Sequence, residues 1–139
     1  MDKAGGYRLA FAYSALLLWS VAGAVTMPAL VPEDPEQLLK QADSIPTSDR
    51  AEFGKLMHRL ANPDLELSAQ QQMHRRYLLA RQAAFAGNFD AALPLLAVVA
   101  DQTAYPTLSF RAKATVIDTL VSQSRYEEAF TKLNPLLAQ

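Results

Sequence analysis

Apolar residues recur along most of the chain at the three- and four-residue spacing of an α-helix. From about Ser68 onward, four such stretches follow one another, separated by short polar or proline-containing breaks. No stretch alternates apolar and polar residues for long enough to suggest a strand. The pattern therefore predicts an all-α fold of antiparallel helical hairpins joined by short loops.

Two stretches of sequence match in register. Gly87–Ala92 recurs 37 residues later as Ser124–Ala129. A fixed period with matched apolar positions is typical of a helical-hairpin repeat, in which small residues allow close helix crossings and larger ones fill the space between hairpins. We expect two repeats, at about 68–104 and 107–139. The matched pairs are Leu79 with Val116, Ala80 with Ile117, Ala83 with Leu120, Leu96 with Leu133, and Val99 with Leu136.

Capping residues indicate where these helices begin and end. Gly87 suits the left-handed conformation that ends a helix. Gln71 and Glu127 complete capping boxes for the first and the last helix. The four expected N-caps are Ser68, Asn88, Thr107 and Ser124.

Upstream, residues 34–67 predict a further hairpin that does not match the repeat in register. We interpret it as a degenerate capping hairpin. Residues 25–33 contain two prolines and indicate an extended spacer. The apolar residues that we expect the hairpin to add to the core are Leu38, Leu39, Phe53, Leu56 and Leu60.

The first 24 residues have the layout of a bacterial secretory signal. Lys3 and Arg8 precede an apolar stretch, and Ala22 to Ala24 form an A-x-A cleavage site. The alternative is an uncleaved membrane anchor, because the stretch of roughly 17 residues from Leu9 to Val25 is at the short limit for crossing a bilayer. Both interpretations export the rest of the chain, so we expect a periplasmic protein, either free or anchored to the inner membrane by this segment.

Composition narrows the classes of partner. The formal net charge of −1 lacks the basic excess that nucleic-acid binding requires. The chain contains no cysteine, which excludes disulfides and cysteine–zinc sites. We therefore expect a protein or peptide partner and no cofactor.

The stretches opening at Gly87 and Ser124 resemble the start of the second helix in tetratricopeptide repeats. This resemblance implies a short tetratricopeptide-like solenoid. The usual aromatic residue of the first helix is replaced by Arg76 and Lys113, and the period exceeds the usual 34 residues.

Three further runs resemble the exported sensor region of bacterial membrane proteins that carry a cytoplasmic GGDEF domain, which makes cyclic di-GMP. The resemblance implies that the chain is the input region of a diguanylate cyclase signalling protein. The chain contains no Gly-Gly-Asp-Glu-Phe run, so the output domain is absent from it. The runs are Leu38–Asp43, Tyr105–Ala112 and Arg125–Phe130.

The repeat places several polar and aromatic side chains on the inner faces of two helices. In helical solenoids this face is the usual groove for peptides, and guanidinium groups suit a ligand carboxylate. The alternative is a solvated face with local ion pairs such as Arg81 with Asp118. The candidate groove residues are His74, Tyr77, Arg81, Arg111 and Asp118.

No recognisable catalytic or metal site accompanies this groove. His58 and His74 lie in different predicted helices with no third ligand at a suitable spacing, so we interpret both as surface histidines. We expect no enzymatic activity of the chain itself. Besides the sensory module, the other hypothesis is a stand-alone cell-envelope scaffold that self-associates through Leu133, Leu136 and Leu137 of its last helix.

Overall fold

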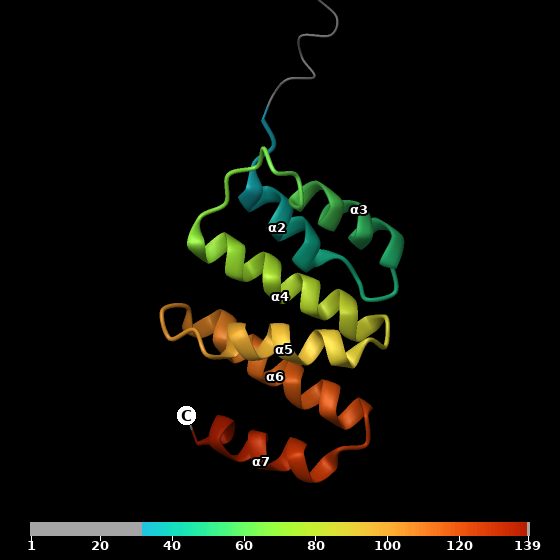
Figure 1. Cartoon of the computed structure of the whole chain (residues 1–139), viewed down its shortest axis with the longest axis vertical. Helices are drawn as coiled ribbons and strands as arrows, with labels where there is room; N and C mark the ends of the chain where they lie inside the picture. Colours follow the sequence, from blue (N-terminus) through green and yellow to red (C-terminus); the bar gives the residue numbers. More distant parts are fainter. Residues whose placement is uncertain (1–31, 139) are drawn as a thin grey trace, which may run out of the picture. The chain divides into compact units, whose positions relative to one another are not determined.

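The computed structural model describes residues 32–138, and its helical unit starts at Asp34 (Figure 1). The expected leader and residues 25–31 of the spacer lie outside the described residues. Within residues 32–138 there are six α-helices and no strand, which confirms the all-α prediction. None of these helices is long and apolar enough to span a bilayer. The helices are α2 (Pro35–Ser44), α3 (Arg50–Leu60), α4 (Ala69–Phe85), α5 (Phe89–Ala100), α6 (Pro106–Ser122) and α7 (Tyr126–Leu137).

From α4 to α7 each helix packs against the next, and the pair formed by α2 and α3 rests on α4 (Figure 1). Helix α6 also contacts α4, two helices earlier. The buried hydroxyl of Ser109 on α6 donates a hydrogen bond to the carbonyl of Ala100 at the end of α5, which ties these two helices together. Helix α4 therefore lies at the centre of the unit, and α7 forms one end of it.

The core draws on every one of these helices. All five apolar residues predicted for the upstream hairpin are buried, and so are Ala80, Ala92 and Ala129 of the repeat. Leu79 was expected between hairpins, but its side chain is exposed. Successive residues differ by roughly 100° around a helix. Leu78 is fully buried, so its neighbour Leu79 points away from the core.

The turns after α4 and α6 have the same backbone geometry, 37 residues apart. Gly87 has φ 78° and Ser124 has φ 59°, both in the left-handed region. In each turn two amides bond back to the preceding helix in the Schellman pattern, which satisfies carbonyls at its end. The bonds are Gly87 N to Ala84 O (3.0 Å), Asn88 N to Ala83 O (2.9 Å), Ser124 N to Val121 O (2.9 Å) and Arg125 N to Leu120 O (2.9 Å).

Two of the predicted N-caps are wrong, for different reasons. Ser124 occupies the left-handed position of the turn. The N-cap of α7 is therefore Arg125, and no capping box with Glu127 forms. Helix α6 begins at Pro106 rather than after Thr107, since proline needs no amide donor and its φ is already helical. The capping box of Ser68 with Gln71 and the Asn88 cap are confirmed.

Candidate functional site

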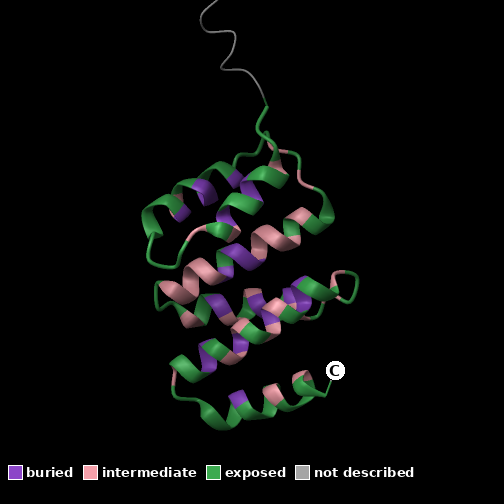
Figure 2. Cartoon of the chain, turned by 180° about the vertical axis from the view of Figure 1, so that it is seen from behind, coloured by how far each residue is buried: buried purple, intermediate pink, exposed green. Residues whose placement is uncertain are grey.

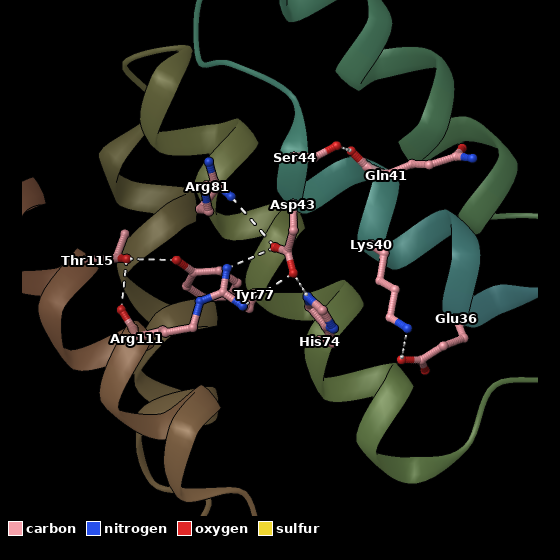
Figure 3. Close-up of polar contacts among 10 residues, drawn as sticks. All are labelled: Glu36, Lys40, Gln41, Asp43, Ser44, His74, Tyr77, Arg81, Arg111 and Thr115. Carbon is pink, nitrogen blue, oxygen red and sulfur yellow. Dashed lines mark hydrogen bonds and ion pairs between the residues drawn. The ribbon is translucent and has the colours of Figure 1, made fainter.

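The carboxylate of Asp43, near the end of α2, gathers three of the five predicted groove residues (Figure 3). His74 Nε2 lies 2.8 Å from Asp43 Oδ2, and Arg111 Nη2 lies 2.8 Å from Oδ1. Arg111 Nη1 donates to Oδ2 at 3.4 Å, so this guanidinium bonds to both oxygens. Arg81 Nη1 lies further away, 3.9 Å from Oδ1. We call these four residues the Asp43 cluster.

Aromatic rings support both guanidinium groups. The Arg111 guanidinium carbon lies 4.6 Å from the centre of the Tyr77 ring, and that of Arg81 lies 5.4 Å from the centre of the Phe85 ring. The Thr115 hydroxyl donates its proton to the Arg111 carbonyl, so the Tyr77 hydroxyl, 3.2 Å from it, must be the donor in their shared bond. Stacking on rings orients both arginines, and two hydrogen bonds to Asp43 further orient Arg111.

In the Asp43 cluster, the carboxylate and Arg111 shift each other's pKa toward the charged form. Burial alone would raise the pKa of Asp43, but the hydrogen bonds and charges of His74 and Arg111 hold that pKa well below its usual range. The hydrogen bond to Asp43 in turn raises the pKa of Arg111. Asp43 is therefore ionised at any physiological pH. Its negative charge is compensated by His74 on α4 and Arg111 on α6.

Four of the predicted groove residues line one cleft of about 430 Å³ between α4 and α6: Tyr77, Arg81, Arg111 and Asp118. His74 lies beside a second cleft of about 360 Å³, formed with the loop before α6. Arg111 lines both clefts and so stands between them. The structure thus gathers the predicted residues, with His74 on the far side of Arg111.

The alternative interpretation of this face named an ion pair between Arg81 and Asp118. The acidic partner of Arg81 is instead Asp43, and the side chain of Asp118 is exposed in the cleft. Sequence reasoning missed Asp43. One signal was available: Asp43 follows the buried Leu39 by four residues, which places a carboxylate on the apolar side of α2.

The remaining candidates are placed as follows. His58 is exposed on α3, as expected of a surface histidine, whereas His74 is half-buried at Asp43. Within residues 32–138 no three metal-ligating side chains come together. Of the three leucines expected to mediate self-association, Leu133 and Leu136 are half-buried, whereas Leu137 is exposed.

Together these features define a class of all-α protein in which stacked helices carry a polar cluster beside an open cleft. Comparison of the chain with protein-family models, with curated proteins and with solved structures gives no significant match. Any functional inference therefore rests on the geometry and on the sequence itself.

Proposed function

We propose that the chain is an exported protein-interaction or sensory module built from tetratricopeptide-like hairpins. The observation that carries this proposal is the repetition of one turn, with the same left-handed residue and the same two backbone hydrogen bonds, at Gly87 and Ser124. Repeated hairpins stack into surfaces that bind other molecules. The chain then acts by binding, without a cofactor or a catalytic site of its own.

The cleft of Tyr77, Arg81, Arg111 and Asp118 is the proposed binding surface. Arg81 lines this cleft and lies 3.9 Å from Asp43, and we propose that its guanidinium also bonds to a ligand carboxylate. The rings of Tyr77 and Phe85 line the same cleft and suit an apolar side chain next to that carboxylate. The proposed partner is a protein or peptide of the cell envelope that presents both groups together.

Peptides selected from a displayed random library against the purified chain would test the cleft. We expect Arg81→Ala with Arg111→Ala to weaken peptide binding at least about tenfold, the change that follows from losing a charged hydrogen bond. Full binding by this double variant would remove the cleft from consideration.

Arg111 also holds Asp43, so a second pair of variants leaves the centre of the cluster intact. Arg81→Gln should weaken binding of acidic peptides, and Asp118→Asn should strengthen it by removing a repelling charge. Arg125→Gln, which changes an exposed arginine outside the cleft, is the matched control. Circular dichroism verifies that each variant is folded.

The resemblance to the sensor regions of GGDEF proteins supports a more specific role. In this proposal the chain is the periplasmic input region of a diguanylate cyclase, and within residues 1–139 only the N-terminal segment contacts the membrane. The reading frame downstream of the codon for Gln139 should then encode a membrane helix followed by a GGDEF motif. A stop codon at that position would exclude this role.

Export can be tested separately. Alkaline phosphatase fused after Gln139 should be active, because this enzyme folds only in an oxidising compartment. The same fusion lacking residues 1–24 should be inactive. Activity without those residues would contradict the proposed export signal.

A stand-alone cell-envelope scaffold is the second candidate. It is favoured by the exposure of Phe130 and Leu137 on α7, at 65% and 74%. Such a scaffold should self-associate, so light scattering over a wide concentration range should show oligomers. A strictly monomeric chain would count against it.

A further inference from the structure

Helices α6 and α7 carry exposed apolar side chains at helical spacing. Most residues of α7 are exposed (Figure 2). On α7, Tyr126, Phe130 and Leu137 are 55%, 65% and 74% exposed. On α6, Phe110 and Val121 are 51% and 44% exposed. Between these exposed residues, each helix carries half-buried or small apolar residues at the same spacing. We call this surface the α6–α7 face, made of Phe110, Ala114, Ile117 and Val121 from α6 and Tyr126, Phe130, Leu133 and Leu137 from α7.

The same positions in the first hairpin are covered. Counting back 37 residues, Ile117 corresponds to Ala80 and Leu133 to Leu96, both fully buried. Ala114 corresponds to Tyr77, which is 5% exposed. The remaining counterparts of the face, where the second hairpin exposes large apolar groups, are half-buried: Met73, Ala84, Phe89, Leu93 and Ala100.

Helix α6 packs against both helices of the first hairpin, α4 and α5. The Tyr77 hydroxyl meets Thr115 of α6. Leu96 shares the core with the apolar side of α6. The first hairpin thus shows which kind of element this surface receives: an amphipathic helix lying across both members of the hairpin.

We propose that the α6–α7 face binds an amphipathic helix of a partner protein, in the position that α6 occupies on the first hairpin. The partner helix would present a stripe of leucine or valine interrupted by small residues, because this is the composition of the buried side of α6. That side consists of Leu108, Ser109, Ala112, Val116, Thr119 and Leu120.

The opposite end of the unit argues against copies that stack head to tail. The outer sides of α2 and α3 are polar, so they offer no apolar stripe to the α6–α7 face. Their exposed residues include Glu36, Lys40, Arg50, Glu52, Lys55 and His58. The face is also distinct from the Arg81–Arg111 cleft, so this inference can fail without affecting the proposed cleft.

A peptide with the sequence of residues 105–123, which contains α6, is a direct probe. Labelled with a fluorophore and titrated with the purified chain, it should bind saturably, as followed by fluorescence anisotropy. Phe130→Glu should weaken this binding at least about tenfold, because it places a charge at the centre of the face. Val98→Glu, the same change at an apolar residue of α5 that is 41% exposed and lies outside the face, should leave binding unchanged. A peptide carrying Ala112→Glu should not bind.

Three outcomes would overturn the inference. The first is the absence of saturable binding to the unchanged chain. The second is equal binding to the Phe130→Glu variant, which would place the peptide elsewhere. The third is dimerisation of the chain, seen by light scattering and abolished by Phe130→Glu, since a second copy would then occupy the face.

Discussion

Gly87 and Ser124 occupy the same left-handed position in two equivalent turns, but only glycine adopts that conformation without steric cost. No atom lies within 4 Å of a Cβ added at Gly87, so a substitution there affects the backbone alone. We expect Gly87→Ala to lower the free energy of unfolding by about 1 kcal/mol. Ser124→Gly should raise it by about 0.5 kcal/mol, because relief of strain outweighs the added entropy of the unfolded chain. Urea denaturation, with the slope m unchanged, measures both; two changes of the same sign would contradict the shared geometry.

The charge of Asp43 joins three helices, because its partners His74 and Arg111 lie on α4 and α6. Replacing it with asparagine leaves Arg111 and His74 without their anion, and we expect a loss of about 1–2 kcal/mol at pH 7, allowing for partial solvent exposure. Folding depresses the pKa of Asp43 below its ordinary value of 3.8, so the carboxylate stabilises the fold fully above that value. The difference between the chain and its Asp43→Asn variant should therefore shrink as the pH falls below about 4. Asp118→Asn, which changes an exposed carboxylate in the cleft lined by Arg81 and Arg111, is the control; a difference independent of pH would contradict the ionic role.

Sequence patterns located individual residues with unequal success. Tyr77, Arg81, Arg111 and Asp118 line one cleft, because helical periodicity fixes which residues share a face; their role in binding stays a prediction. Asp43 was missed because its partners His74 and Arg111 lie 31 and 68 residues away along the chain. Capping and periodicity rules describe neighbours in sequence and carry no information on contacts of that range. Those contacts depend on how α2, α4 and α6 are arranged relative to one another.

The second helix of each repeat begins with a different kind of N-cap residue. Asn88 caps α5 by accepting a hydrogen bond from the amide of Ala91, whereas Arg125 begins α7 without a side-chain cap and pairs with Glu128 instead. Loss of a cap typically costs about 1 kcal/mol, so we expect Asn88→Ala to destabilise the protein by this amount. Arg125→Ala removes an exposed ion pair with Glu128 and an exposed hydrogen bond to Gln123, so the thermal midpoint of the protein should not change measurably. Equal effects in thermal denaturation would contradict this difference between the caps.

The same comparison explains which helix boundaries the sequence could predict. Ser68 and Asn88 act locally, each through an amide three residues away, and both predicted caps are confirmed. Ser124 reads equally well as a cap or as the last residue of a turn. Its register with Gly87 indicates the turn, because the turn geometry repeats after 37 residues together with the apolar positions.

Across the whole helical unit, packing is uneven from one end to the other. Helix α4 contacts α2, α3, α5 and α6, whereas within residues 32–138 α7 packs only against α6 and has a single buried residue, Ala129. Backbone amides exchange with solvent through local opening, which is easiest where few apolar groups hold a helix in place. We therefore expect hydrogen exchange, followed by mass spectrometry of the native chain, to show the strongest protection in α4 and the weakest among the helices in α7.

This gradient also connects stability to binding. A helix seated on the α6–α7 face would bury Phe130 and Leu137 and would slow the opening of α7 by mass action. Saturating peptide 105–123 should thus increase protection in α7 and leave α2 and α3 unchanged, whereas with Phe130→Glu the pattern should not respond to peptide. Protection that rises evenly over all helices would indicate general stabilisation rather than occupation of this face. Protection of α7 as strong as that of α4 before any addition would mean that the outermost helix is already held by contacts beyond those with α6.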